Sequence, residues 1–125
     1  MLILLSGQEF TDFRSPSIAK YAHSLNENEE ETLSLIHRVV EVLDELDRKI
    51  EEKIPSMKKL SIPMVVVAME KVMDNPEKET AYLEWLKNFF DTYDSQDEYL
   101  KFCKTSTASA ENVIGRLDYF LKVVE

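Results

Sequence analysis

Apolar residues recur three or four positions apart over a long central stretch of the chain. From about residue 29 to residue 53 this spacing is followed by Leu33, Ile36, Val40, Leu43, Leu46 and Ile50. Charged residues lie on the opposite side of the same stretch: Arg38, Glu41, Glu45, Arg48 and Glu52. The pattern predicts one long amphipathic helix that ends before Pro55, because the residue preceding a proline is driven out of the α region. Its apolar stripe suits packing inside a bundle and would equally suit a homodimer.

Shorter helices are predicted on both sides of this one. Ser15 and Pro16 are residue types preferred at a helix N-cap and at the first helical position, so a helix is expected from there to about Leu25. Another short helix is expected over residues 97–104. Ser109 is a suitable cap for a last helix. The apolar stripe of that last helix comprises Val113, Ile114, Leu117, Phe120, Leu121 and Val124.

The stretch from Met64 to Met69 is apolar on every side. Its β-branched residues favour a buried strand on propensity alone, but the chain offers no second strand to pair with it. We therefore predict a central buried helix that begins near Ser61-Ile62-Pro63 and stops at Asn75-Pro76. The next helix, over residues 77–92, carries an aromatic stripe that predicts core packing. The positions that follow the helical spacing are Tyr82, Trp85 or Leu86, Phe89, Phe90 and Tyr93.

Composition supports a helical protein. The chain has 125 residues, 44% of them hydrophobic and 31% charged, with two glycines and four prolines, which disfavours both disorder and a turn-rich all-β fold. No apolar stretch approaches the roughly 20 residues that a membrane-spanning helix needs. The fold class expected is therefore all-α, a compact bundle of about five to six helices that forms a single helical domain over residues 1–125.

The net charge and the cysteine content indicate which ligands and which cellular compartment suit this chain. The net charge of -9 disfavours direct binding of nucleic acid by this chain, because phosphates would be repelled unless the basic residues were gathered on one face. A single cysteine, Cys103, has no internal partner for a disulfide, which favours a reducing cytoplasm. We interpret Cys103 as a structural thiol and expect a cytoplasmic protein.

The segment KTSTASAENVIGR, residues 104 to 116, is the main candidate for chemistry. It lacks the glycines of a phosphate cradle before its helix, and we interpret it first as a loop and a cap. Hydroxyls, a helix N-terminus and two cations are nevertheless available to hold one anion, so a weak nucleotide- or anion-binding site is an alternative. Its candidate residues are Lys104, Thr105, Ser106, Thr107, Ser109 and Arg116.

The sequence gives little support for a metal site or a catalytic site elsewhere in the chain. His37 and Glu41 lie one turn apart on the long helix, but two such residues on a charged helix more often form a surface pair than a metal site. His23 belongs to no recognisable constellation. We predict no metal site, no cofactor and no catalytic residue.

Two neighbouring stretches resemble a known family. YLEWLKNFF, followed by YLKFCKTSTASAENVIGRLDYF, is similar to the C-terminal helical region of the GmrSD-type family, whose members join a ParB/sulfiredoxin-like nuclease half to a helical half. In that family a Ser- and Thr-rich segment precedes a helix with an arginine, matched here by Arg116 after Thr107, Ser109 and Val113. SGQEFTDFRSPSIAKYA and KKLSIPMVVVAM also resemble the helical half.

The resemblance implies a role in restriction or phage defence without catalysis by this chain. The catalytic half of the family is marked by an Asp-Gly-Gln-x-Arg type motif, and Ser6-Gly7-Gln8-Glu9-Phe10 lacks both its Asp and its Arg. The chain would then be the helical half alone, as a fragment of a longer protein or as a separate product. It would pack on a nuclease or nucleotide-hydrolysing half or contribute to target recognition.

A second hypothesis comes from charge. A short chain with a net charge of -9 and no catalytic set is also typical of a small acidic interaction protein, such as an antitoxin or an inhibitor that mimics DNA. A DNA mimic should present one face dense with carboxylates.

Overall fold

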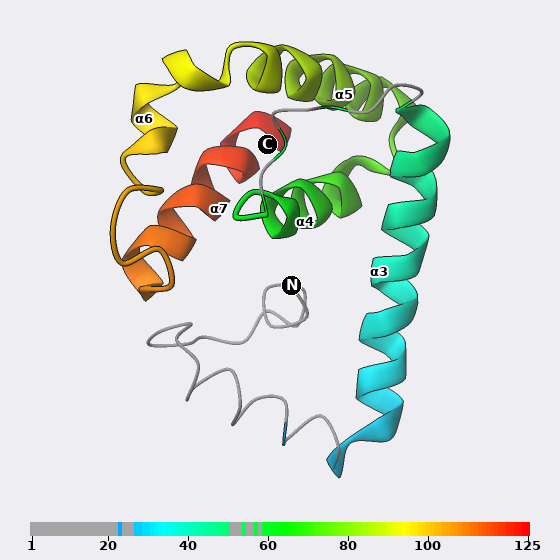
Figure 1. Cartoon of the computed structure of the whole chain (residues 1–125). Coiled ribbons are helices and arrows are strands. Elements are labelled where there is room, and N and C mark those ends of the chain that lie inside the picture. The colour runs from blue at the N-terminus through cyan, green and yellow to red at the C-terminus, as the bar shows by residue number, and fades with distance from the viewer. Residues whose placement is uncertain (1–22, 24–26, 51–53, 55–56, 58) are drawn as a thin grey trace.

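The computed structural model describes residues 23, 27–50, 54, 57 and 59–125 of the chain. Within these residues there are α-helices and one 3-10 turn, and the described part contains no strand. The helices are α3 (Glu29–Lys49), α4 (Ile62–Val72), α5 (Pro76–Asp91), α6 (Asp97–Leu100) and α7 (Ala110–Val124), and the 3-10 turn is Tyr93–Ser95. The predicted all-α bundle of five to six helices is confirmed (Figure 1).

The ends of α3 follow from its charges and from the chain that comes after it. Glu29, Glu30 and Glu31 lie in its first turn, where carboxylates stabilise the positive end of the helix dipole. Ile50 is the C-cap, so the helix ends at Lys49 rather than near Lys53 as predicted. The helix predicted from Ser15 to Leu25 lies outside the described residues, except for His23, which is helical and exposed.

Helix α4 is the centre of the bundle. It lies between α3, α5 and α7 (Figure 1) and contacts all three. Every side chain from Met64 to Met69 is buried. The prediction of a central buried helix, rather than a strand, is confirmed. Pro63 lies in its first turn, where a missing N–H breaks no helical hydrogen bond.

An aromatic cluster fills the space between α5, α6 and α7. Phe89 lies at its centre and is fully buried, as are Phe90, Tyr99 and Phe120. The rings of Phe89 and Trp85 stack at a centroid distance of 4.9 Å, and the Tyr99 ring meets Phe89 edge-on at 5.1 Å. The prediction that the aromatic stripe of residues 77–92 is core is confirmed.

Most members of the predicted apolar stripe of α3 do not pack inside the bundle, which was one of the two roles expected for it. Four of them are substantially exposed: Leu33 (56%), Ile36 (43%), Val40 (47%) and Leu43 (44%). Leu46 of the predicted stripe does enter the core, together with Leu35 and Val42, which lie outside that stripe. The physical reason is that α3 carries two overlapping apolar stripes at helical spacing, and α4 packs on the second.

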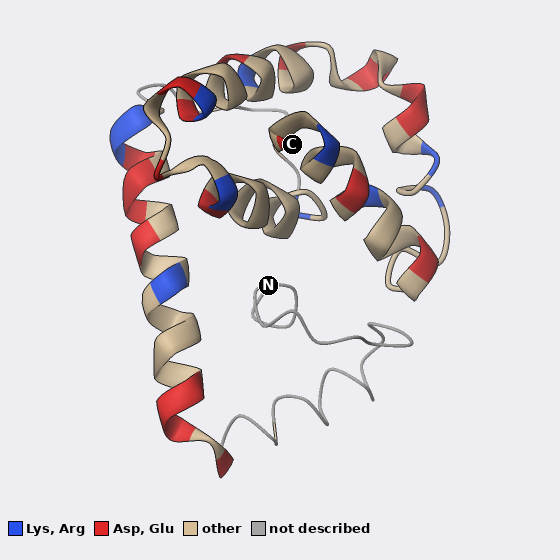
Figure 2. Cartoon of the chain, turned by 180° about the vertical axis from the view of Figure 1, so that it is seen from behind, with Lys and Arg blue, Asp and Glu red and all other residues tan. Residues whose placement is uncertain are grey.

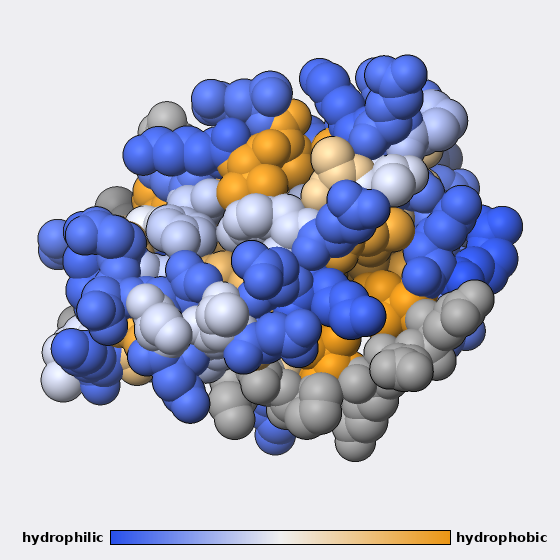
Figure 3. All heavy atoms as spheres, turned by 90° about the horizontal axis from the view of Figure 1, so that it is seen from above, coloured by the Kyte–Doolittle hydropathy of each residue, from blue (hydrophilic) through white to orange (hydrophobic). Residues whose placement is uncertain are grey.

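The outer surface is mixed in both polarity and charge. Hydrophilic side chains cover most of the face seen from above, with smaller hydrophobic areas between them (Figure 3). Along α5 acidic and basic residues are interspersed, whereas the N-terminal end of α3 is acidic (Figure 2). Along α5, the carboxylates are therefore not gathered on one dense face.

Ion pairs hold α3 against the rest of the bundle. Arg38 on α3 binds the Glu70 carboxylate on α4 with two hydrogen bonds, from Nε at 2.8 Å and from Nη2 at 2.5 Å. The Lys49 ammonium lies 3.5 Å from the buried Glu79 carboxylate near the start of α5. The hydrogen bond from Arg38 lowers the pKa of Glu70 below its usual range, so this carboxylate favours the folded state when it is charged.

We expect the substitution Glu70→Gln to destabilise the fold by about 1 kcal/mol at neutral pH, because a half-exposed bidentate pair contributes about that much. The pKa of Glu70 is lower in the folded state than the value of about 4.3 in the unfolded chain. The contribution is therefore complete above that value and is lost as the pH falls through the folded pKa. Urea unfolding of the wild-type and Glu70→Gln proteins, at several pH values from neutral to acidic, measures the difference in their stability. The control is the exposed Glu84→Gln on α5. A stability difference that did not shrink in acid would contradict this prediction.

Candidate functional site

The Ser/Thr run forms the connection between α6 and the last helix, α7. Ser109 is the N-cap of α7, and its hydroxyl oxygen accepts a hydrogen bond from the backbone N–H of Asn112 at 3.3 Å. This confirms the predicted cap. Lys104, Thr105 and Ser106 are exposed, whereas Thr107 and Ser109 are half-buried.

Arg116 reaches this loop from the buried side. Its side chain is only 3% exposed, and its two terminal nitrogens donate to backbone carbonyls, Nη1 to Phe102 at 2.7 Å and Nη2 to Thr107 at 2.8 Å. Its Nε has no hydrogen-bond partner in the described part of the chain, and none of the ion pairs found there involves Arg116. Among the described residues, the guanidinium is thus compensated by carbonyl oxygens rather than by a carboxylate.

Asn112 completes the attachment of the loop to α7. Its side-chain nitrogen donates to the carbonyl oxygens of Thr105 at 2.8 Å and of Ser106 at 3.0 Å. Ser106 has a φ of 49°, in the left-handed region that non-glycine residues rarely adopt. The hydrogen bonds from Asn112 help to hold this conformation.

A close approach beneath the same loop requires Gly115. A Cβ atom built at Gly115 would lie 2.4 to 2.8 Å from ring atoms of Phe102, so a side chain there would displace the ring. The missing side chain lets Phe102 lie against α7. The carbonyl of Phe102 is in turn the oxygen that accepts from Arg116 Nη1.

The structure therefore brings all six anion-binding candidates to one loop, but it uses the most deeply buried of them for another purpose. Four carbonyl oxygens, of residues 102, 105, 106 and 107, turn toward donors on α7. Two of them lie directly against the Arg116 guanidinium, where their partial negative charge opposes the approach of an anion. The contacts favour a structural role for Arg116, and anion binding by the run stays a prediction.

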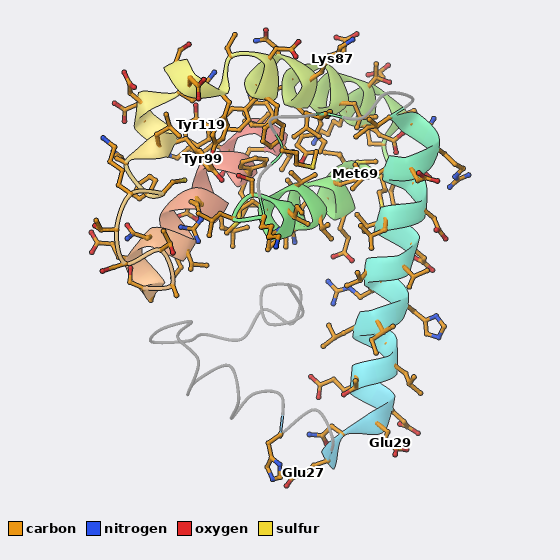
Figure 4. All side chains as sticks on the ribbon, viewed as in Figure 1. Glu27, Glu29, Met69, Lys87, Tyr99 and Tyr119 are labelled. Atoms are coloured by element: carbon orange, nitrogen blue, oxygen red, sulfur yellow. The ribbon has the colours of Figure 1, made fainter. Side chains whose placement is uncertain are left out.

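A buried polar cluster that the sequence did not predict lies beside this loop. The hydroxyls of Ser61, just before α4, and Tyr99, on α6, are 2.6 Å apart and fully buried. Burial raises the pKa of Tyr99, and the hydrogen bond with Ser61 acts in the opposite direction. Burial also raises the pKa of the neighbouring Tyr93, and the Cys103 thiol raises it further. Figure 4 shows Tyr99 and Tyr119 inside the bundle, whereas Lys87 points outward from α5.

This cluster joins segments that are distant in sequence. Ser61 and Tyr99 are 38 positions apart, and the Cys103 sulfur lies 3.8 Å from the Tyr99 carbonyl oxygen. A second buried tyrosine, Tyr82, donates its hydroxyl to the Val65 carbonyl at 2.9 Å. These groups satisfy one another inside the protein, which supports a structural role.

The described residues offer no alternative centre for metal chemistry. They contain no group of three or more His, Cys, Asp and Glu residues placed to hold a metal ion. His37 and Glu41 are both exposed on α3. In the same part of the chain, no helix is long and apolar enough to cross a membrane.

Comparison with models of known families, with curated proteins and with solved structures finds no match to this chain. The resemblance to the GmrSD-type family therefore stays a prediction that rests on the residues quoted above. The function is inferred from the contacts and exposed surfaces of the chain itself.

Proposed function

We propose that this chain is a non-catalytic interaction domain that packs on another polypeptide through α3. The observation that carries the proposal is the row of four exposed apolar side chains on α3, called here the α3 stripe: Leu33, Ile36, Val40 and Leu43. Single exposed apolar residues are normal on a protein surface, but a continuous row along one helix is typical of a surface that binds a partner.

The position of the stripe supports this role. Leu35, Val42 and Leu46 already supply the contacts of α3 with the core. The N-terminal part of α3 extends beyond the other described helices (Figure 1). The stripe is thus not needed to join α3 to α4, and its position leaves it accessible to another molecule.

The resemblance to the GmrSD-type family gives one identity for the partner. There the helical half accompanies a nuclease or nucleotide-hydrolysing half, and the stripe would be the surface that packs on that half or contributes to target recognition. A stand-alone acidic interaction protein, such as an antitoxin, would use the same surface. The interspersed charges of α5 support a protein partner over mimicry of DNA (Figure 2).

Photo-crosslinking in the cells that produce the protein tests this function. Ile36 on α3 and Ile114 on α7 are the same residue type with nearly equal exposure, 43% and 44%. Each is replaced, in separate proteins, by a photoreactive phenylalanine analogue. We expect a crosslink to a second polypeptide at position 36 and little or none at position 114. Equal yields at both positions, or no crosslink at position 36, would reject an interface on α3.

A further inference from the structure

We propose that the partner of the α3 stripe is a basic amphipathic helix of another protein, with an apolar ridge flanked by Lys or Arg. This inference rests on the proposed function and adds the chemistry of the partner. It is carried by the charged residues that surround the stripe. Each of those charged residues is exposed on α3.

The length of the stripe indicates a helix as its occupant. Leu33, Ile36, Val40 and Leu43 are spaced by three, four and three residues, which is the spacing of the seam between two packed helices. From Leu33 to Leu43 the stripe extends for roughly 15 Å along α3, at about 1.5 Å per residue. An apolar ridge of about three helical turns would cover it.

The frame of the stripe is acidic. Glu29 lies four residues before Leu33 and Asp47 lies four residues after Leu43, so these two carboxylates lie on the same side of the helix at the two ends of the stripe. Figure 4 places Glu29 at the N-terminal end of α3. All the carboxylates around the stripe are exposed: Glu29, Glu30, Glu41, Asp44 and Asp47.

Two other groups along the outer edge of the stripe are not acidic. His37 lies between Glu30 and Asp44 on that edge, and Arg48 lies close to Asp44. The Arg48 guanidinium already forms an ion pair with Glu45 at 2.6 Å. The net field at the stripe is therefore negative, and a partner helix with flanking cations is the complementary one.

A second copy of this chain is the less suitable occupant. In an antiparallel pair, the register that sets Leu33 opposite Leu43 and Ile36 opposite Val40 also sets Glu29 opposite Asp47 at both ends. In a parallel pair, each carboxylate would face its own equivalent. Either arrangement adds repulsion between like charges to that of two chains with a net charge of -9 each.

Two synthetic helical peptides of about 18 residues test the inference, because this length exceeds the stripe at both ends. Both carry the same leucine ridge, flanked by lysines in one and by glutamates in the other. We expect the lysine peptide to bind the full chain at least about tenfold more tightly than the glutamate peptide, by fluorescence anisotropy. Raising the salt from about 0.1 M to about 1 M shortens the screening length from about 10 Å to about 3 Å and should remove most of that difference.

Variants of the protein decide whether binding occurs at the stripe. Ile36→Ser should weaken binding of the lysine peptide by about tenfold or more, whereas the matched Ile114→Ser should leave it unchanged. Replacing Glu41 and Asp44 together by lysine should invert the preference between the two peptides. Circular dichroism and thermal unfolding verify that each variant is folded.

Each contrary outcome overturns the inference in a distinct way. Equal binding of both peptides would reject a basic partner. A dimer that is detected by sedimentation and abolished by Ile36→Ser would assign the stripe to a second copy. Failure of both peptides to bind would reject an amphipathic helix as the occupant of the stripe. If both peptides bound equally but position 36 formed a crosslink in cells, the basic partner would be rejected and the proposed function would stand.

Discussion

The substitution Phe89→Ala is expected to destabilise the protein by about 3–5 kcal/mol, the cost of removing a large aromatic ring from a close-packed core. Phe89 is fully buried, and its ring lies within 6 Å of six others. Those rings are Trp85, Phe90, Tyr93, Tyr99, Tyr119 and Phe120. They come from α5, the 3-10 turn, α6 and α7, so the resulting cavity would loosen every element that surrounds the aromatic cluster.

The fluorescence of Trp85 gives a direct measurement of this effect. It is the single tryptophan of the chain and stacks on Phe89. Urea unfolding followed at this residue should show a smaller loss for Phe89→Leu, which keeps more of the apolar volume, than for Phe89→Ala. Lys87→Ala, on the exposed side of the same helix, should change stability by no more than about 0.5 kcal/mol. A loss below about 1 kcal/mol for Phe89→Ala would contradict the central position of this ring.

The residues that line the core were largely predictable, because α4 and α5 each have a single dominant signal. In α4 the run from Met64 to Met69 is apolar on all sides, so it has to be buried whichever face is considered. In α5 the aromatic residues recur at helical spacing, and only one face of the helix can hold them. The Ser109 cap was predictable for a local reason, since its hydroxyl binds an N–H only three residues ahead.

The buried face of α3 was not predictable, because local periodicity does not distinguish two competing stripes. One stripe runs through Leu33, Ile36, Val40 and Leu43, and the other through Leu35, Val42 and Leu46. Both satisfy the helical period. The choice is made by contacts that are distant in sequence, above all those with α4, and the ion pair between Arg38 and Glu70 is consistent with it. The unused stripe then becomes the proposed interface.

The candidate site was predictable only as a set of residues. Residues 104–109 and Arg116 do meet around one loop, which their closeness in sequence and the polarity of the run had suggested. The depth of Arg116 was not predictable, because arginine is seldom fully buried. The pair of Ser61 and Tyr99 has no local signal at all, since 38 residues separate its members.

Arg116→Ala is the second substitution from which a large effect is expected, a loss of about 2–4 kcal/mol in the free energy of unfolding. The side chain is 3% exposed and donates to the carbonyls of Phe102 and Thr107. Alanine would leave both oxygens without these donors and would open a cavity between the loop and α7. Arg116→Lys should recover part of the loss, because one ammonium does not reproduce the fork of the guanidinium. Urea unfolding of the wild-type, Arg116→Ala and Arg116→Lys proteins measures these losses in stability.

Two controls separate this structural role from anion binding. Lys104→Ala removes an exposed cation of the same loop and should change stability by no more than about 0.5 kcal/mol. Thermal unfolding at constant ionic strength should show no saturable stabilisation of the wild-type protein by inorganic phosphate, since a ligand that binds the folded state raises stability with its concentration. If phosphate did stabilise the protein, and if both Lys104→Ala and Arg116→Lys abolished that effect, the loop would be an anion site. Because carbonyl oxygens already occupy both terminal nitrogens of Arg116, we expect Arg116→Ala and Arg116→Lys to lower stability, and we expect neither these variants nor the wild-type protein to be stabilised by phosphate.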